Sequence, residues 1–301
     1  MKVLIIGVGG VGGFLGSYLE ETDFDITYVA RGERFNYLKN RGLVVHTKLG
    51  ERRIRNIKVR HSIPENDRYD FIISTVKLYD FDNLISELKT VGLKEAILLP
   101  FQNGIYAEQK ISSEFEKVQA HGAVAQISSF IDDDQIIRHV GELATFFVGK
   151  MNEKNDSKLI DFCQKSQNVG LDIRLKQNIK EKIWDKFIFL SAYSGITTLT
   201  QKTIGEIFET QNLRKKFVEA MNETYNLSKS FGVIFKSNPV KYWIKKIEKM
   251  PSHMTSSMFI DYKKNKKLEL NWLSGSIIRY SQRFGNACPI HKEIVDGIIS
   301  R

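Results

Sequence analysis

Three glycines near the start of the chain have the spacing of a phosphate-binding turn. Gly7, Gly9 and Gly12 fit the pattern G-x-G-x-x-G. The first glycine permits a tight turn, the second lets the backbone approach a pyrophosphate, and the third lets a helix pack against a strand. A helix beginning there offers free N–H groups and a positive dipole end to phosphates. We therefore predict a dinucleotide-binding turn, with a merely flexible loop as the alternative, formed by Gly7, Val8, Gly9, Gly10, Val11 and Gly12.

The residues around the turn predict the strand and the helix that such a site needs. Lys2–Ile6 is a short apolar run typical of a strand buried on both faces. A second apolar run, Asp25–Ala30, follows after a short turn. Between them, apolar residues recur at helical spacing at Phe14, Leu15, Tyr18 and Leu19. The whole is a βαβ unit of about 30 residues, the size of the first unit of a dinucleotide-binding sheet.

The end of the second strand indicates which dinucleotide binds. NAD sites usually place Asp or Glu about 20 residues after the turn, to hold the ribose 2′-hydroxyl. Here Arg31 occupies that place and Arg34 follows it. The only nearby acid, Glu33, lies beyond the strand end. Because Arg matches a 2′-phosphate in charge and in its forked donor geometry, we expect NADP. The alternative is two solvated surface arginines.

The order of the elements predicts two domains. We expect an α/β domain over residues 1–176, a Rossmann-like, doubly wound parallel sheet, and an all-helical domain over 177–301. Further strands of the first domain are expected at 71–76, 96–99, 118–127, 135–140, 143–148 and 171–175, with a helix at 158–166. Helices of the second domain are expected at 179–193, 213–231, 240–250 and 268–284.

Composition limits the class of protein. With 42% apolar and 27% charged residues, the 301-residue chain is neither disordered nor collagen-like. Cys163 and Cys288 have no metal-binding spacing, and no apolar run reaches the ~20 residues of a membrane span. We therefore expect a cytoplasmic protein without a membrane partner. A net charge of +10 suits an anionic small ligand, a nucleic acid, a membrane surface or simply a generally basic protein surface.

Several short motifs occur in one order along nearly the whole chain, and together they resemble the ketopantoate reductase (2-dehydropantoate 2-reductase) family. The family reduces the 2-oxo acid ketopantoate to pantoate with NADPH, in pantothenate biosynthesis. The motifs are GVGGVG, the strand-end Arg31, STVKLYD around Lys77, FQNG around Asn103, WDKF around Lys186, SSM around Ser257 and LELNW around Glu269.

The resemblance assigns roles to these residues. It implies that the glycine turn and Arg31 hold NADP and that Lys77 lies by the cofactor. Asn103 would bind both cofactor and substrate, where nicotinamide and substrate meet. Lys186 matches the catalytic lysine of the family. The remaining matches are a substrate-binding serine, Ser257, and an acidic residue near the reacting groups, Glu269.

The chemistry of ketone reduction supports a lysine in this role. A ketone that accepts hydride develops alkoxide charge, which a nearby ammonium stabilises and protonates. A lysine serves best if burial and neighbouring cations lower its pKa from about 10.4 toward 7–8. Lys180 and Lys182 are the candidate cations, and a nearby carboxylate would oppose the shift. Glu269 would orient the lysine or the substrate hydroxyl. The alternatives are a surface lysine at 186 and a solvated helix-start acid at 269.

The sequence departs from the family in the substrate pocket. Where the family usually carries asparagines, this chain has Leu190, Ser194 and Ile204. Leu and Ile cannot donate hydrogen bonds to a hydroxyl or a carboxylate. Replacement donors would have to be Ser191, Ser194 or Thr198, and Ser194 is our candidate for substrate binding. The identity of the 2-oxo acid therefore stays open.

Other features carry less weight. The six histidines show no H-x-x-x-H spacing, so we predict no metal. The run Asp132–Asp134 is expected to be a solvated turn before a strand, with a cation site as the alternative. No nucleic-acid motif accompanies the basic charge, so we expect no nucleic-acid partner. Besides ketopantoate reduction, we retain a reductase of another branched 2-oxo acid and a non-catalytic NADP sensor. The oligomeric state, a homodimer included, is left open.

Overall fold

Two compact units make up the chain. The computed structural model describes residues 1–65, 67–92, 96–115, 121–151 and 154–300. The first unit comprises Met1–Gln102 and Ala107–Ile179, and the second comprises Asn103–Tyr106 and Lys180–Arg301. The short segment Asn103–Tyr106 therefore groups with residues far along the chain rather than with its sequence neighbours.

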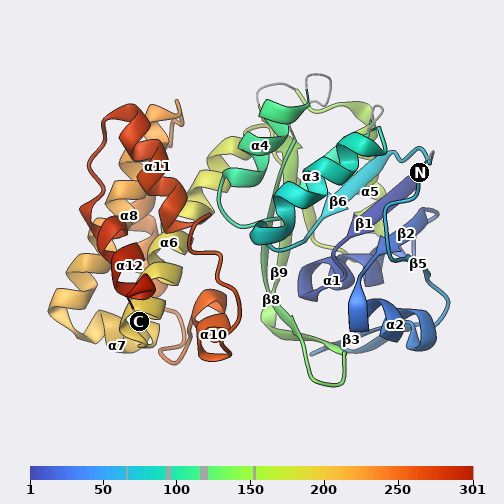
Figure 1. Cartoon of the computed structure of the whole chain (residues 1–301), viewed down its shortest axis with the longest axis horizontal. Helices are drawn as coiled ribbons and strands as arrows, with labels where there is room; N and C mark the ends of the chain where they lie inside the picture. The colour runs from blue at the N-terminus through green and yellow to red at the C-terminus, as the bar shows by residue number, and fades with distance from the viewer. Residues whose placement is uncertain (66, 93–95, 116–120, 152–153, 301) are drawn as a thin grey trace. The chain divides into compact units, whose positions relative to one another are not determined.

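A parallel sheet lies at the centre of the first unit, in the strand order β5-β2-β1-β6-β7 (Figure 1). Its strands are β1 (Lys2–Ile6), β2 (Asp25–Val29), β5 (Lys58–Arg60), β6 (Phe71–Ser74) and β7 (Ile97–Pro100). In the register of β1 with its two neighbours, Ile6 is opposite both Val29 and Ser74. The carboxyl ends of these three strands therefore meet at one edge of the sheet, where ligands bind in open α/β sheets.

Helices alternate with the strands along this part of the chain and bury apolar faces. They are α1 (Gly10–Leu19), α2 (Gly32–Arg41), the 3₁₀ turn η1 (Leu78–Asp80), α3 (Phe81–Thr90), α4 (Tyr106–Glu114) and α5 (Ser157–Asn168). In α3 the buried residues Phe81, Leu84, Ile85 and Leu88 recur at the spacing of one helical face. The predicted Rossmann-like parallel sheet is thereby confirmed.

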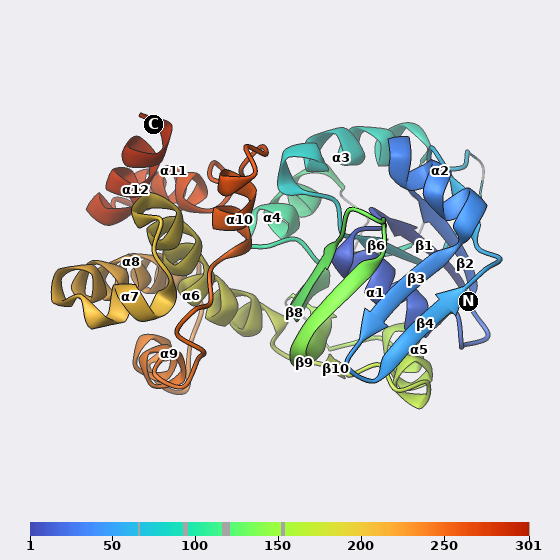
Figure 2. The ribbon, with the colours of Figure 1, turned by 90° about the horizontal axis from the view of Figure 1, so that it is seen from below.

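A second, mixed sheet takes up strands that we expected in the parallel one. Its order is β10-β9-β3-β4, with β8 paired to β9. The strands are β3 (Leu43–Thr47), β4 (Gly50–Ile54), β8 (His121–Ile131), β9 (Ile137–Lys150) and β10 (Ile173–Leu175). The start of the predicted strand 118–127 lies outside the described residues. β8 and β9 pair antiparallel because a short turn joins them, whereas parallel pairing needs a longer crossover. Helix α1 contacts strands of both sheets (Figure 2).

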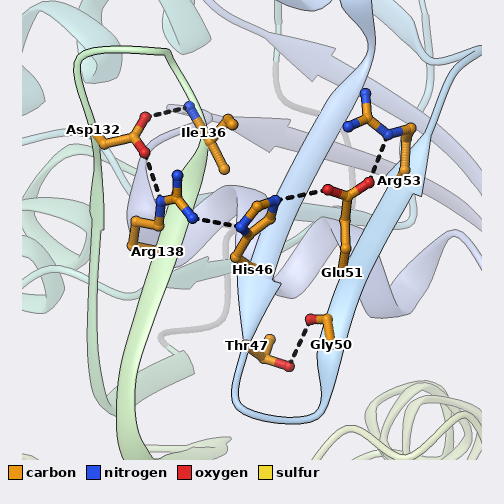
Figure 3. A network of polar contacts seen from close by, with 8 residues as sticks. All are labelled: His46, Thr47, Gly50, Glu51, Arg53, Asp132, Ile136 and Arg138. Atoms are coloured by element: carbon orange, nitrogen blue, oxygen red, sulfur yellow. Dashed lines mark hydrogen bonds and ion pairs between the residues drawn. The ribbon is translucent and has the colours of Figure 1, made fainter.

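The turn between β8 and β9 is fixed by Asp132, in the network shown in Figure 3. Its carboxylate accepts from the Ile136 backbone N–H at 2.8 Å and from Arg138 Nε at 2.6 Å. Burial opposes the effect, but these bonds hold the pKa of Asp132 below its ordinary value. Arg138 donates onward to His46 Nδ1, and His46 Nε2 lies 2.7 Å from Glu51 Oε2. The aspartate run is thus a turn, as expected, but Asp132 is bonded rather than merely solvated.

The second unit is built mainly of helices, as predicted (Figure 1). They are α6 (Ile179–Thr200), α7 (Ile204–Glu209), α8 (Gln211–Ser230), α9 (Pro239–Ile247), α10 (Ser257–Lys263), α11 (Ser274–Phe284) and α12 (Pro289–Ile299). The predicted helix 268–284 begins only at Ser274, because backbone bonds within 269–273 form turns instead. No helix in the described part of the chain is long and apolar enough to span a membrane.

Candidate active site

The first and third glycines of the turn are required by close backbone approaches. Gly7 has φ +91°, and a Cβ there would lie 2.8 Å from the backbone N of Val76. A Cβ on Gly12 would lie 2.2 Å from the Gly7 carbonyl oxygen. The Thr75 hydroxyl donates to that same carbonyl. The turn is therefore locked against β6, as the glycine spacing predicts.

The start of α1 has the features of a phosphate site. Gly9 is the N-cap and makes no side-chain capping bond, and the first turn of the helix holds no acidic residue. A Cβ on Gly9 would meet nothing within 4 Å, so this side of the turn is open. The first N–H groups of a helix have no intrahelical acceptors, and the dipole there favours an anion. The described residues thus fit the pyrophosphate of a dinucleotide.

Arg31 lies beside this turn but is paired with a carboxylate that the sequence did not reveal. The Gly7 backbone N–H donates to the Val29 carbonyl at 3.1 Å, which places the end of β2 against the turn. Arg31 is the N-cap of α2, and its guanidinium forms an ion pair with Glu87 of α3. Glu87 is 56 positions away. Sequence reasoning considered only Glu33, because no local pattern links α3 to the end of β2.

Arg34, one helical turn after Arg31, supports the turn directly. Its Nε donates to the Val8 carbonyl at 2.8 Å, and its Nη1 donates to the Gln135 carbonyl of the β8–β9 hairpin. Nη2 is buried and has no hydrogen-bond partner among the described residues. Burial lowers the pKa of Arg34 to about 10, so the guanidinium keeps its charge at neutral pH. Arg34 therefore joins the hairpin to the glycine turn.

The ends of β6 and β7 carry two further polar residues. Lys77 follows β6 and caps η1, where its carbonyl accepts from the Asp80 N–H at 2.9 Å. Gln102, just after β7, is buried and donates to Ser74 Oγ at 2.7 Å and to the Val76 carbonyl at 3.1 Å. Sequence reasoning singled out Asn103 in this segment and missed the neighbouring Gln102. No sequence pattern indicated that Gln102 joins the end of β7 to the end of β6.

In the second unit, the structure brings together two predicted residues that lie 83 positions apart. Lys186 Nζ donates to Asn103 Oδ1 at 2.8 Å. Lys186 lies on α6, whose Trp184 ring packs against Phe187 at 5.8 Å and against Phe231 at 5.0 Å between centroids. These apolar contacts fix the orientation of α6 around the lysine. The ammonium is therefore held in a defined direction by a neutral amide oxygen.

The cations expected to influence Lys186 have other partners. Lys182 forms an ion pair with Asp185 at 2.9 Å, and Lys180 Nζ donates to the Phe231 carbonyl at 2.6 Å. Asp185 is also bound by the Trp243 indole N–H, 3.0 Å from its carboxylate. The charge of Lys182 is therefore partly compensated. The influence of the Lys182 charge on the pKa of Lys186 stays a prediction.

The other predicted residues of the second unit differ in exposure. Glu269 lies in the turns before α11 and is only 7% exposed, so it is not a solvated helix-start acid. Ser257 is exposed at the first position of α10. The preceding Ser256 is the buried cap of that helix and accepts from the Phe259 N–H at 3.1 Å. The role of Ser257 toward a substrate stays a prediction.

The positions that replace the family's asparagines are more apolar than polar. Ile204 is buried in the core at the start of α7, and Leu190 is half-buried on α6. Ser191 is engaged with the Thr224 hydroxyl at 2.9 Å. The buried hydroxyls of Ser194 and Thr198 find no partner within the described residues. Of the three replacement donors, these two are therefore the ones with unused hydrogen-bonding capacity.

A buried polar network lies behind this face of α6. His291 Nε2 lies 3.0 Å from the Thr224 hydroxyl, and its Nδ1 lies 3.2 Å from Ser274 Oγ. The Glu223 carboxylate accepts from the His291 backbone N–H at 3.0 Å. Burial lowers the pKa of His291 to about 4, so the ring is neutral at neutral pH. Within the described residues, no group of three or more His, Cys, Asp or Glu side chains could hold a metal ion.

Comparison with known families covers almost the whole chain. Residues 3–153 match the profile of the family described as "Ketopantoate reductase PanE/ApbA". Residues 178–299 match the profile described as "Ketopantoate reductase PanE/ApbA C terminal". The two matches follow each other in the order expected for one protein of this kind.

Individual relatives are more distant. The chain is 28% identical to an uncharacterized oxidoreductase, YkpB, of Bacillus subtilis, covering 96% of this chain and 95% of that one. It is 26% identical to a 2-dehydropantoate 2-reductase of Pyrococcus horikoshii, covering 97% and 94%. The crystal structure of 2-dehydropantoate 2-reductase from Geobacter metallireducens shares the fold, with a TM-score of 0.89, 19% identity and coverage of 100% and 99%. A D-mandelate dehydrogenase in ternary complex with NADH and anilino(oxo)acetate does so with a TM-score of 0.87, 18% identity and coverage of 100% and 97%.

Proposed function

The chain belongs to the ketopantoate reductase family, and on that premise we propose that it reduces a 2-oxo acid to a 2-hydroxy acid with NADPH. The first candidate substrate is 2-dehydropantoate, with pantoate as the product for pantothenate biosynthesis. The observation that carries the proposal is the 2.8 Å hydrogen bond from Lys186 Nζ to Asn103 Oδ1. Ketone reduction needs an oriented ammonium, and this pair supplies one.

The cofactor is assigned mainly to groups of the first unit, with Asn103 of the second unit added. The N–H groups at the start of α1 would bind the pyrophosphate, because the helix offers them without a capping side chain. Arg31 supports NADPH through its match to a 2′-phosphate. Lys77 and Asn103 complete the set by family resemblance. The D-mandelate dehydrogenase with the same fold binds NADH, so the choice of dinucleotide needs its own test.

The reaction assigns separate roles to the side chains of the second unit. A bound nicotinamide supplies the hydride that adds to the carbonyl carbon. Lys186 stabilises the negative charge that develops on the carbonyl oxygen and then gives that oxygen a proton, which completes the hydroxyl group. Asn103 holds the ammonium in position. Glu269, a buried acid, orients the lysine or the substrate. We expect Glu269→Ala to impair turnover, with the larger share of the loss in substrate binding.

The pocket favours no single substrate. Ser194 has a buried hydroxyl without a partner in the described structure. Leu190 is a half-buried apolar side chain on the same helix, whereas Ile204 lies in the core. Family resemblance puts these positions next to the substrate, and a hydroxyl beside apolar side chains suits a branched 2-oxo acid. They therefore support a second candidate, a reductase of a branched substrate other than ketopantoate. A non-catalytic NADP sensor is less favoured, because Lys186 has both its partner and its packing.

The test is NADPH oxidation by the purified protein against a panel of 2-oxo acids. The panel includes ketopantoate, other branched 2-oxo acids and a linear one. We expect the largest kcat/KM for a branched member. Protein that binds NADPH but oxidises it with no member of the panel would contradict the proposal and favour the sensor.

A further inference from the structure

The ion pair between Arg31 and Glu87 leaves one carboxylate oxygen without a partner. Glu87 Oε1 accepts from Arg31, whereas Oε2 is buried and has no hydrogen-bond donor among the described residues. A buried carboxylate oxygen without a donor costs free energy, and such atoms in folded proteins call for an explanation. A donor that arrives with a ligand would remove the cost.

The position of this pair identifies the part of the ligand that would meet it. β1 and β2 end in register, and Arg31, the N-cap of α2, lies two residues after the end of β2. In dinucleotide-binding sheets the adenosine ribose lies at the end of the second strand, where a carboxylate accepts from the 2′-hydroxyl. Glu87 provides a carboxylate at that place from another helix, α3. The usual sequence position of that acid is occupied by Arg31.

We propose that Glu87 determines the cofactor preference: it accepts the ribose 2′-hydroxyl of NADH and withholds Arg31 from the 2′-phosphate of NADPH. This inference rests on the proposed dinucleotide function. The protein therefore uses both dinucleotides, and its preference for NADPH is smaller than Arg31 alone would give. With NADPH, the phosphate must compete for Arg31 against a carboxylate of the same charge sign.

The charges around Arg31 are of both signs, so that they favour neither NADPH nor NADH strongly. Glu33, in the first turn of α2, adds a second negative charge near the arginine. Arg34 is held by the Val8 and Gln135 carbonyls and contributes a fixed positive charge. Arg31 is 57% exposed, so its guanidinium has room to exchange partners. Glu87 is the member of the pair whose replacement shifts this balance without touching the glycine turn.

The experiment measures the dissociation constants of NADPH and NADH by fluorescence titration, independently of turnover. Glu87→Gln removes the charge, and we expect NADPH to bind about 5-fold more tightly, the upper range for one exposed ion pair. Glu87→Ala also removes the acceptor, and NADH should bind about 10-fold more weakly. Glu248→Gln is the matched control, because Glu248 pairs with Arg214 at a similar exposure in the second unit.

Arg31→Ala separates the two proposals. If it weakens NADPH selectively but both Glu87 variants leave the NADPH-to-NADH ratio unchanged, the role of Glu87 is wrong and the proposed cofactor function stands. If Arg31→Ala weakens NADPH and NADH equally, Arg31 does not read the phosphate, and the roles of both Arg31 and Glu87 in cofactor choice fail. Unchanged thermal melting of the Glu87 variants will show that the ratios come from binding and not from unfolding.

Discussion

The two units present charge to a ligand in different ways. In the first, backbone N–H groups at the start of α1 have no capping side chain and suit an anion, and the nearby Arg31 is exposed. In the second, the charge belongs to one side chain, Lys186, whose partner Asn103 is 83 positions away. Backbone groups survive most substitutions, whereas an ammonium depends on one residue. Binding and chemistry should therefore respond separately to mutation.

Replacing Lys186 should have the largest effect on turnover, and it should separate the chemical step from cofactor binding most clearly. Lys186→Ala removes the proton donor to the alkoxide, so we expect kcat on the best substrate to fall by ~10² or more. The Kd of NADPH should hardly change, because the glycine turn and Arg31 belong to the other unit. Single-turnover kinetics and cofactor titration on the same preparation will check this. Full turnover by the variant would remove Lys186 from the mechanism.

Acid should destabilise the helical unit through His291. The folded chain takes up this proton only near pH 4, whereas the unfolded chain takes it up near pH 6.5. As the pH falls through this window, protonation favours the unfolded chain, and stability of about 3 kcal/mol is lost. Chemical denaturation from pH 7 to 4 measures it. His291→Gln should flatten this part of the profile; an unchanged slope would show that other groups cause it.

A substitution at Arg34 tests whether dinucleotide binding by the first unit depends on backbone N–H groups alone. Arg34→Ala removes two bonds to carbonyls, including that of Val8 in the turn. We expect NADPH and NADH to bind about 10-fold more weakly and to the same extent, since both carry the pyrophosphate. Titration with each dinucleotide gives the two constants. A loss confined to NADPH would instead make Arg34 a reader of the 2′-phosphate.

The smallest effect is expected in the substrate pocket. Leu190→Asn restores an amide at a position where the family usually has one, and it should raise kcat/KM for ketopantoate about 3- to 10-fold relative to other 2-oxo acids. The panel described above measures the ratio, with Leu190→Met as a control for size. Equal changes with both substitutions would show that shape rather than hydrogen bonding sets the preference.

Features formed by residues close together in the sequence could be predicted, whereas features formed by residues far apart in the chain could not. The glycine turn could be predicted because the three glycines, the strand before them and the helix after them adjoin in the sequence. The close approach of Gly7 to Val76 could not, because only the fold brings these residues together. The mixed sheet could not be predicted either, because the hairpin of β8 and β9 has the same apolar runs as parallel strands. Glu87 was missed for a related reason: it meets Arg31 only through the fold. Lys186 and Asn103 were found through family resemblance rather than spacing.

The segment Asn103–Tyr106 has a consequence for how the protein can be divided. Because this segment groups with the helical unit, the chain passes between the units three times, and no single cut separates them. A fragment of residues 180–301 would carry Lys186 without the amide that orients it. An exchange of helical units between relatives would likewise have to carry the loop after β7. The protein is therefore a poor candidate for modular recombination at a single junction.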